Sequence, residues 1–72
     1  MALYQATITK DRPLADGEFI ESWMTVQFTC TTDPWTLEQG KPINDAFRQS
    51  YDIDLRENGV LNRMIVRVEK VK

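Results

Sequence analysis

The chain has 72 residues, a single cysteine, no histidine and a formal net charge of −2. It is long enough for one domain (residues 1–72), and its core is thin because a domain this small buries only about 60% of the surface that its unfolded chain exposes. The single Cys30 excludes an internal disulfide, and the missing histidine removes a common zinc ligand and the commonest general base. We therefore expect no metal, no cofactor and no catalytic residues, which leaves association with a second chain as the support for a small fold.

Two segments in the first half alternate between apolar and polar residues, as half-buried strands do. In residues 3–10 one face would carry Tyr4, Ala6 and Ile8, and the other Gln5, Thr7 and Thr9. In residues 23–32 one face would carry Met24, Val26, Phe28 and Cys30, with mostly threonine on the other. This pattern predicts two neighbouring antiparallel strands with one covered face and one open face. Cys30 is interpreted as a small buried hydrophobic residue.

The segment between these strands, residues 11–19, contains Pro13, Asp16 and Gly17. These residues favour turns, and the segment is too long for a two-residue hairpin. Either a mobile loop or a small ordered loop fits this composition.

A helix is predicted after the second strand. Asp33 and Pro34 favour a short helical turn, after which Trp35 and Leu37 would pack back on the sheet edge. From Pro42 onward the spacing of Ile43, Ala46, Phe47 and Tyr51 predicts an apolar helix stripe. Asn44, Asp45, Arg48 and Gln49 would then face water. Residues 51–55 suit either a short edge strand or a helix end followed by a loop.

Residues 60–70 are rich in β-branched side chains and predict a third long strand. Met64, Val66 and Val68 would face the core, while Arg63, Ile65, Arg67, Glu69 and Val71 would lie outside. The fold class expected is α+β, a small three-stranded, mainly antiparallel sheet in the order β-β-α-β along the chain, with one helix packed on one face. The first strand would lie in the middle of the sheet.

Exposed aliphatic side chains on an otherwise polar sheet face often mark a contact surface. We expect a protein-contact site formed by Trp23, Ile65, Arg67 and Val71. The two free edges of a three-stranded sheet offer a further route to association by strand addition. The function expected is that of a small non-enzymatic protein-interaction module. Its simplest partner would be a second copy of the chain, which gives a homodimer, and the other candidate is a different protein.

The alternative function is contact with nucleic acid through the basic end of the chain. Residues 58–72 contain four basic residues and one acidic residue, and Arg63, Arg67 and Lys70 are the candidate contacts. The net negative charge of the whole chain argues against binding driven by electrostatics. No phosphate loop is present, because Gly17, Gly40 and Gly59 are far apart.

No apolar run approaches the ~20 residues that span a bilayer, and the first ten residues lack the order of a signal peptide. We therefore expect a cytoplasmic protein without a membrane partner. In a general way, without a residue motif, the compact chain resembles the small accessory or inhibitor proteins of phages and mobile elements.

Overall fold

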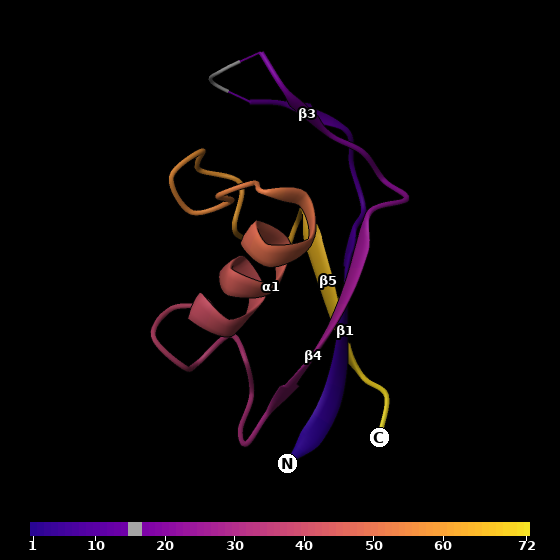
Figure 1. The fold of residues 1–72 in the computed structure, drawn as a ribbon, viewed down its shortest axis with the longest axis vertical. Helices are drawn as coiled ribbons and strands as arrows, with labels where there is room; N and C mark the ends of the chain where they lie inside the picture. The colour runs from indigo at the N-terminus through magenta and orange to yellow at the C-terminus, as the bar shows by residue number, and fades with distance from the viewer. Residues whose placement is uncertain (15–16) are drawn as a thin grey trace.

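The computed structural model describes residues 1–14 and 17–72. It is an α+β fold in which one helix, α1 (Lys41–Tyr51), lies on one face of a three-stranded antiparallel sheet (Figure 1). The sheet consists of β1 (Ala2–Ile8), β4 (Thr25–Cys30) and β5 (Val66–Lys70), in the order β4-β1-β5. The predicted fold class is confirmed, including the central place of the first strand.

The pairing register separates the two faces of the sheet. Ala6 lies opposite Val26 on one side and opposite Val68 on the other, which puts these three apolar residues in one row facing α1. Thr7 lies between Thr25 and Arg67 in the next row, on the open face. Successive side chains of a strand point to opposite faces, so the predicted alternation holds along β1 and β4.

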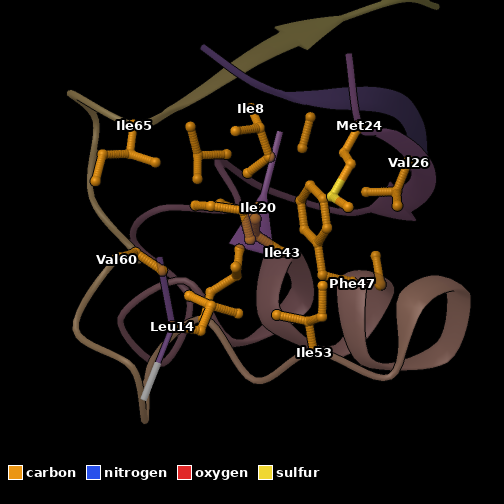
Figure 2. Close-up of a cluster of buried hydrophobic side chains, with 14 residues drawn as sticks. Ile8, Leu14, Ile20, Met24, Val26, Ile43, Phe47, Ile53, Val60 and Ile65 are labelled. Carbon is orange, nitrogen blue, oxygen red and sulfur yellow. The ribbon is translucent and has the colours of Figure 1, made fainter. Parts of the chain in front are cut away.

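The core lies between the sheet and α1 (Figure 2). Phe47 and Ile43 of the helix are completely buried, as are Ile8 of β1 and Leu55 beyond the helix. The burial of Ile43 and Phe47 follows from the predicted helix stripe, because residues three and four positions apart lie on the same helix face. Ile20 is also completely buried, so the segment between β1 and β4 contributes to the core as well.

That segment forms a second, two-stranded sheet. β2 (Arg12–Pro13) pairs antiparallel with β3 (Phe19–Ile20), and this hairpin extends beyond one end of the main sheet (Figure 1). Leu14 and Ile20 anchor it to the core. Of the two alternatives, the small ordered loop fits the described residues 11–14 and 17–19; the turn expected at Asp16 lies outside them.

The third strand is shorter than predicted, and the side chains of Met64 and Ile65, just before it, have the opposite burial from that predicted. Residues 62–65 form a turn in which the side-chain oxygen of Asn62 accepts the N–H groups of Met64 (3.0 Å) and Ile65 (3.1 Å). Met64 is 73% exposed and Ile65 only 7% exposed. The predictions of a core Met64 and an outer Ile65 are wrong, because the turn interrupts the two-residue period before β5 begins at Val66.

Residues 51–55 form no strand in the structure. The helix ends at Tyr51. Asp52 adopts a left-handed conformation (φ 57°), and its N–H donates to the carbonyl of Arg48 (3.0 Å). Ile53 and Leu55 lie in the irregular segment that follows, and both side chains are buried. The helix end followed by a loop is thus the correct alternative.

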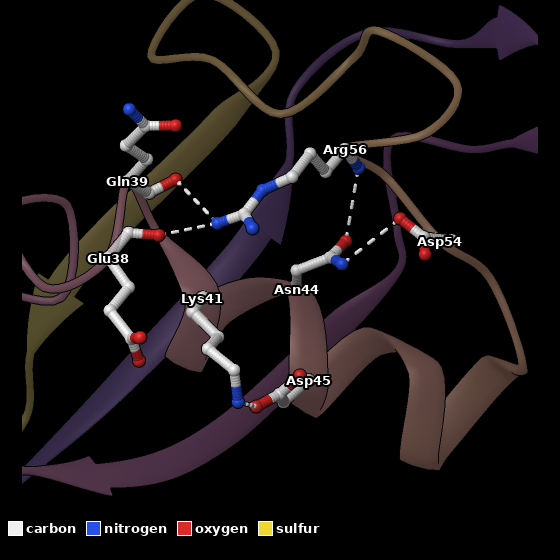
Figure 3. Close-up of polar contacts among 7 residues, drawn as sticks. All are labelled: Glu38, Gln39, Lys41, Asn44, Asp45, Asp54 and Arg56. Atoms are coloured by element: carbon white, nitrogen blue, oxygen red, sulfur yellow. Dashed lines mark hydrogen bonds and ion pairs between the residues drawn. The ribbon is translucent and has the colours of Figure 1, made fainter.

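Asn44 is buried rather than in water, which corrects the predicted polar face of the helix. Its Oδ1 accepts the backbone N–H groups of Leu55 (2.7 Å) and Arg56 (3.1 Å), and its Nδ2 donates to Asp54 (3.0 Å). Figure 3 shows the bonds to Arg56 and Asp54. One amide side chain therefore holds the segment after the helix against the helix itself.

The turn before α1 is held from the same segment. Glu38 and Gln39 have positive φ angles, and both of their carbonyls accept the guanidinium of Arg56 (Figure 3). Trp35 packs against the core, as expected, but Leu37 is 39% exposed. The prediction that Leu37 packs on the sheet is wrong.

Candidate functional site

The predicted protein-contact residues do not form one patch. Trp23 is 64% exposed and lies edge-on to the ring of Tyr51, close to the end of β1 where Ile8 donates to Met24 (2.9 Å). Val71 is exposed at the opposite end of β1, where its N–H donates to Leu3 (2.7 Å). Five residues of strand separate these two ends by about 17 Å.

Arg67 lies on the exposed part of β5, between Trp23 and Val71 along the sheet. Ile65, the fourth expected contact residue, is buried beside β5. Three of the four expected residues thus lie in or next to β5, and Trp23 lies on the far side of β1, next to β4.

The residues of the nucleic-acid alternative also point in different directions. Arg67 is on the open face of the sheet, whereas Lys70, three residues further along the strand, is on the opposite face. Arg63 lies over the ring of Trp35, 5.3 Å from its centroid. Arg67 forms an ion pair with Glu69 through its guanidinium. The structure does not bring these three cations into one basic surface.

The open face of the sheet is covered by polar side chains that bond to one another. Thr25 donates to Thr7 (3.2 Å) and Gln27 donates to Gln5 (3.1 Å) across the β1–β4 pair. On β5, Arg67 and Glu69 complete this polar surface. Among the described residues, apolar side chains occur on this face only at one end, at Leu3 and Val71, so the face as a whole is not the candidate site.

A hollow of about 380 Å³ lies between the hairpin and the segment after α1. Its lining is Leu14, Glu18, Asp52, Ile53, Asp54, Glu57 and Asn58. Asp54 accepts the N–H of Glu57 (2.9 Å) and the amide of Asn44, and these hydrogen bonds hold its pKa below the usual 3.8. A carboxyl that stays ionised cannot act as a general acid at neutral pH. Within the described residues no group of three or more histidine, cysteine or acidic residues is arranged to hold a metal ion.

The two edges of the main sheet remain as candidate sites, and the first of them is partly closed. Ile8 of β1 donates to Met24, so the backbone groups of Met24 and of every second residue after it point toward β1. The backbone groups of Thr25, Gln27 and Thr29 therefore point away from the sheet, and we call this row the β4 edge. The hydroxyl of Tyr51 bonds to both the N–H (3.3 Å) and the carbonyl (3.2 Å) of Thr25. A groove of about 420 Å³ between the helix and β4 runs beside the rest of this edge.

The second edge is open. Because Thr9 donates to Ile65 (2.7 Å), the outward backbone groups of β5 belong to Val66, Val68 and Lys70, which we call the β5 edge. The N–H of Val66 donates to Asn62 (2.9 Å). Within residues 1–14 and 17–72, no backbone or side-chain group bonds to the outward groups of Val68 or Lys70.

These two residues were missed as site residues, although the signal was present in the sequence. Once the first strand is placed in the middle, the third strand must be an edge. The missing information was the register, which decides whether the backbone groups of the even or of the odd residues of β5 point away from β1. That register depends on the turn at Asn62, which the alternation of side chains does not reveal.

Comparison with known protein families gives a match over most of the chain. The model of a family described as "Family of unknown function (DUF6140)" matches residues 1–68. No curated protein and no solved structure matches the chain. No helix in the described parts of the chain has the length and apolar character needed to cross a membrane.

Proposed function

We propose that this chain, which belongs to the DUF6140 family of unknown function, is a non-enzymatic protein-interaction module that self-associates through the β5 edge. The observation that supports this proposal is the row of unpaired N–H and C=O groups at Val68 and Lys70. An exposed row of this kind is a template for a further strand. Pairing there would satisfy these groups and extend a small sheet.

The position of the helix favours the β5 edge over the β4 edge. α1 packs against β4, and the hydroxyl of its last residue, Tyr51, occupies the outward groups of Thr25. A strand added to β4 would have to fit beside the helix, whereas β5 lies on the other side of the central strand. The cytoplasm is the compartment we propose, in keeping with a single cysteine that is a buried thiol.

Sedimentation velocity on two matched proline variants tests the proposal. Lys70→Pro removes an outward N–H from the β5 edge, and Thr29→Pro removes an outward N–H from the β4 edge. Both side chains are exposed, and proline is tolerated on edge strands where the N–H faces away from the sheet. Circular dichroism and thermal unfolding establish that both variants are folded.

The wild-type chain and Thr29→Pro should sediment as dimers, and Lys70→Pro as a monomer at the same concentration. Lys70→Pro also removes one positive charge from a chain of net charge −2, so Lys70→Ala, which loses the same charge but keeps the N–H, is the control and should remain a dimer. Dissociation by Thr29→Pro alone would transfer the contact to the β4 edge. A wild-type chain that remains monomeric at every concentration would overturn the proposal.

A further inference from the structure

We infer that two copies pair β5 with β5 antiparallel, about a two-fold axis that passes through Val68. This inference rests on the proposed function and adds the register of the pairing. It is carried by two features of β5: which backbone groups point outward, and the order of the charges on its open face.

The outward backbone groups allow a short antiparallel ladder. With the axis at Val68, each Val68 exchanges hydrogen bonds with the partner's Val68, and Lys70 lies opposite the partner's Val66. The N–H of Val66 already donates to Asn62, but its carbonyl can accept the N–H of the partner's Lys70. Every free N–H of the β5 edge thereby gains an acceptor.

The charges select this register. Arg67 lies opposite the partner's Glu69, and Glu69 lies opposite the partner's Arg67, at positions where facing side chains come closest. Within one chain Arg67 already forms an ion pair with Glu69 on the open face. Two copies would therefore form a ring of four charges in which opposite signs alternate.

The neighbouring registers lack this complementarity. An axis through Glu69 would place two carboxylates directly opposite each other, and an axis through Arg67 would do the same with two guanidinium groups. Like charges in directly opposite positions destabilise a sheet. The Arg67 register would also need the N–H of Val66, which is already bonded to Asn62.

The core side of the sheet fits the same arrangement. Val68 is half-buried and faces the same side as α1, but the helix packs on β4 at the far side of the sheet. In the proposed dimer the two Val68 side chains would cover each other. The two helices would stay apart, because β1 and β5 of both copies lie between them.

Charge reversal tests the register. Arg67→Glu gives one copy two acidic residues on this face, and Glu69→Arg gives two basic residues. Either variant alone should self-associate at least about tenfold more weakly than the wild-type chain, as measured by sedimentation equilibrium. An equimolar mixture of the two should form a heterodimer, because each acidic position then faces a basic one. The double variant with both changes should regain self-association.

Cysteine cross-linking gives a second readout with its own control. In a Cys30→Ala background, Val68→Cys should form an intermolecular disulfide on mild oxidation, because directly opposite, hydrogen-bonded residues lie about 5.5 Å apart at Cα, within disulfide range. Arg67→Cys and Glu69→Cys, whose counterparts are offset, should cross-link more slowly. Circular dichroism on each variant confirms that the fold is retained.

The outcomes separate this inference from the proposed function. A wild-type dimer in which Lys70→Pro dissociates the copies, but Glu69→Cys cross-links faster than Val68→Cys, would overturn the register and leave the β5 edge in place. Charge variants that associate as strongly as wild type would do the same. A monomeric wild-type chain would overturn both.

Discussion

The hydroxyl of Tyr51 lies within hydrogen-bonding distance of both backbone groups of Thr25, 3.3 Å from the nitrogen and 3.2 Å from the oxygen. The last residue of the helix thus occupies part of one sheet edge, while on the other edge, within residues 1–14 and 17–72, only the N–H of Val66 is bonded, and the outward groups of Val68 and Lys70 are not. Edge strands of natural proteins are commonly protected in this way. The asymmetry between the two edges is the basis of the proposed function.

Removing this hydroxyl should destabilise the fold without changing the association state. We expect Tyr51→Phe to lower the free energy of unfolding by about 0.5–1.5 kcal/mol, the usual contribution of an intramolecular hydrogen bond. Urea denaturation measures the loss. Tyr4→Phe, which removes the hydroxyl of the ring stacked on Phe28, is the control and should cost less. Equal losses in both variants would show that the bonds to Thr25 contribute nothing.

The amide of Asn44 should be among the most sensitive polar groups of the chain. Asn44→Ala leaves the N–H of Leu55 without its partner in a buried position, which costs about 1–3 kcal/mol. For a domain of this size each kcal/mol lowers the unfolding temperature by about 4–8 °C. Gln49→Ala, at an exposed position of the same helix, should change it little. Differential scanning calorimetry compares the two, and similar melting temperatures would contradict this role.

Two glycines that both have a positive φ angle should differ in their tolerance of a side chain. Gly40 (φ 87°) and Gly59 (φ 72°) are both left-handed, so Ala at either position costs roughly 1–2 kcal/mol. A Cβ on Gly40 would also lie 3.3 Å from Leu61, whereas Gly59 has open space. Gly40→Ala should therefore be the less stable variant in urea denaturation. The reverse order would show that the contact with Leu61 relaxes freely.

The stability of the fold should depend on the ionisation of Asp54. Its pKa is lowered in the folded state, first by the N–H of Glu57 and then by the amide of Asn44. A lowered carboxyl pKa stabilises the fold above the unfolded value near 3.8, and this stabilisation is lost as the pH falls through the folded pKa. Asp54→Asn should be less stable than wild type at neutral pH, and the difference should shrink below about pH 4. Parallel stability curves in urea titrations at several pH values would refute this.

The sequence was informative where a single period extends over a whole element. The alternation in β1 and β4 and the stripe of Ile43, Ala46 and Phe47 predicted the sheet, the helix and their packing correctly. A regular backbone imposes this period on side chains, so it can be interpreted without tertiary information.

Errors arose where a side chain bonds to the backbone and interrupts the period. Asn62 forms the turn that buries Ile65, and Asn44 turns inward to bind the segment after the helix. The partners of Asn44 are brought near only by the folded chain, whereas Asn62 binds the backbone two and three residues ahead, in a local turn that the two-residue period does not reveal. The contact site was incompletely predicted for a related reason: unpaired backbone groups at Val68 and Lys70 depend on register and not on residue type.

Amide hydrogen exchange in the wild-type chain, at single-residue resolution, tests whether the β5 edge pairs while the β4 edge stays free. In a concentrated sample, the amides of Val68 and Lys70 should be protected, and their protection should decrease on dilution. The amides of Gln27 and Thr29, which point outward from the β4 edge, should exchange quickly at every concentration. If Val68 and Lys70 exchange as quickly as Gln27 and Thr29 in the concentrated sample, the β5 edge does not pair and the proposed dimer is wrong.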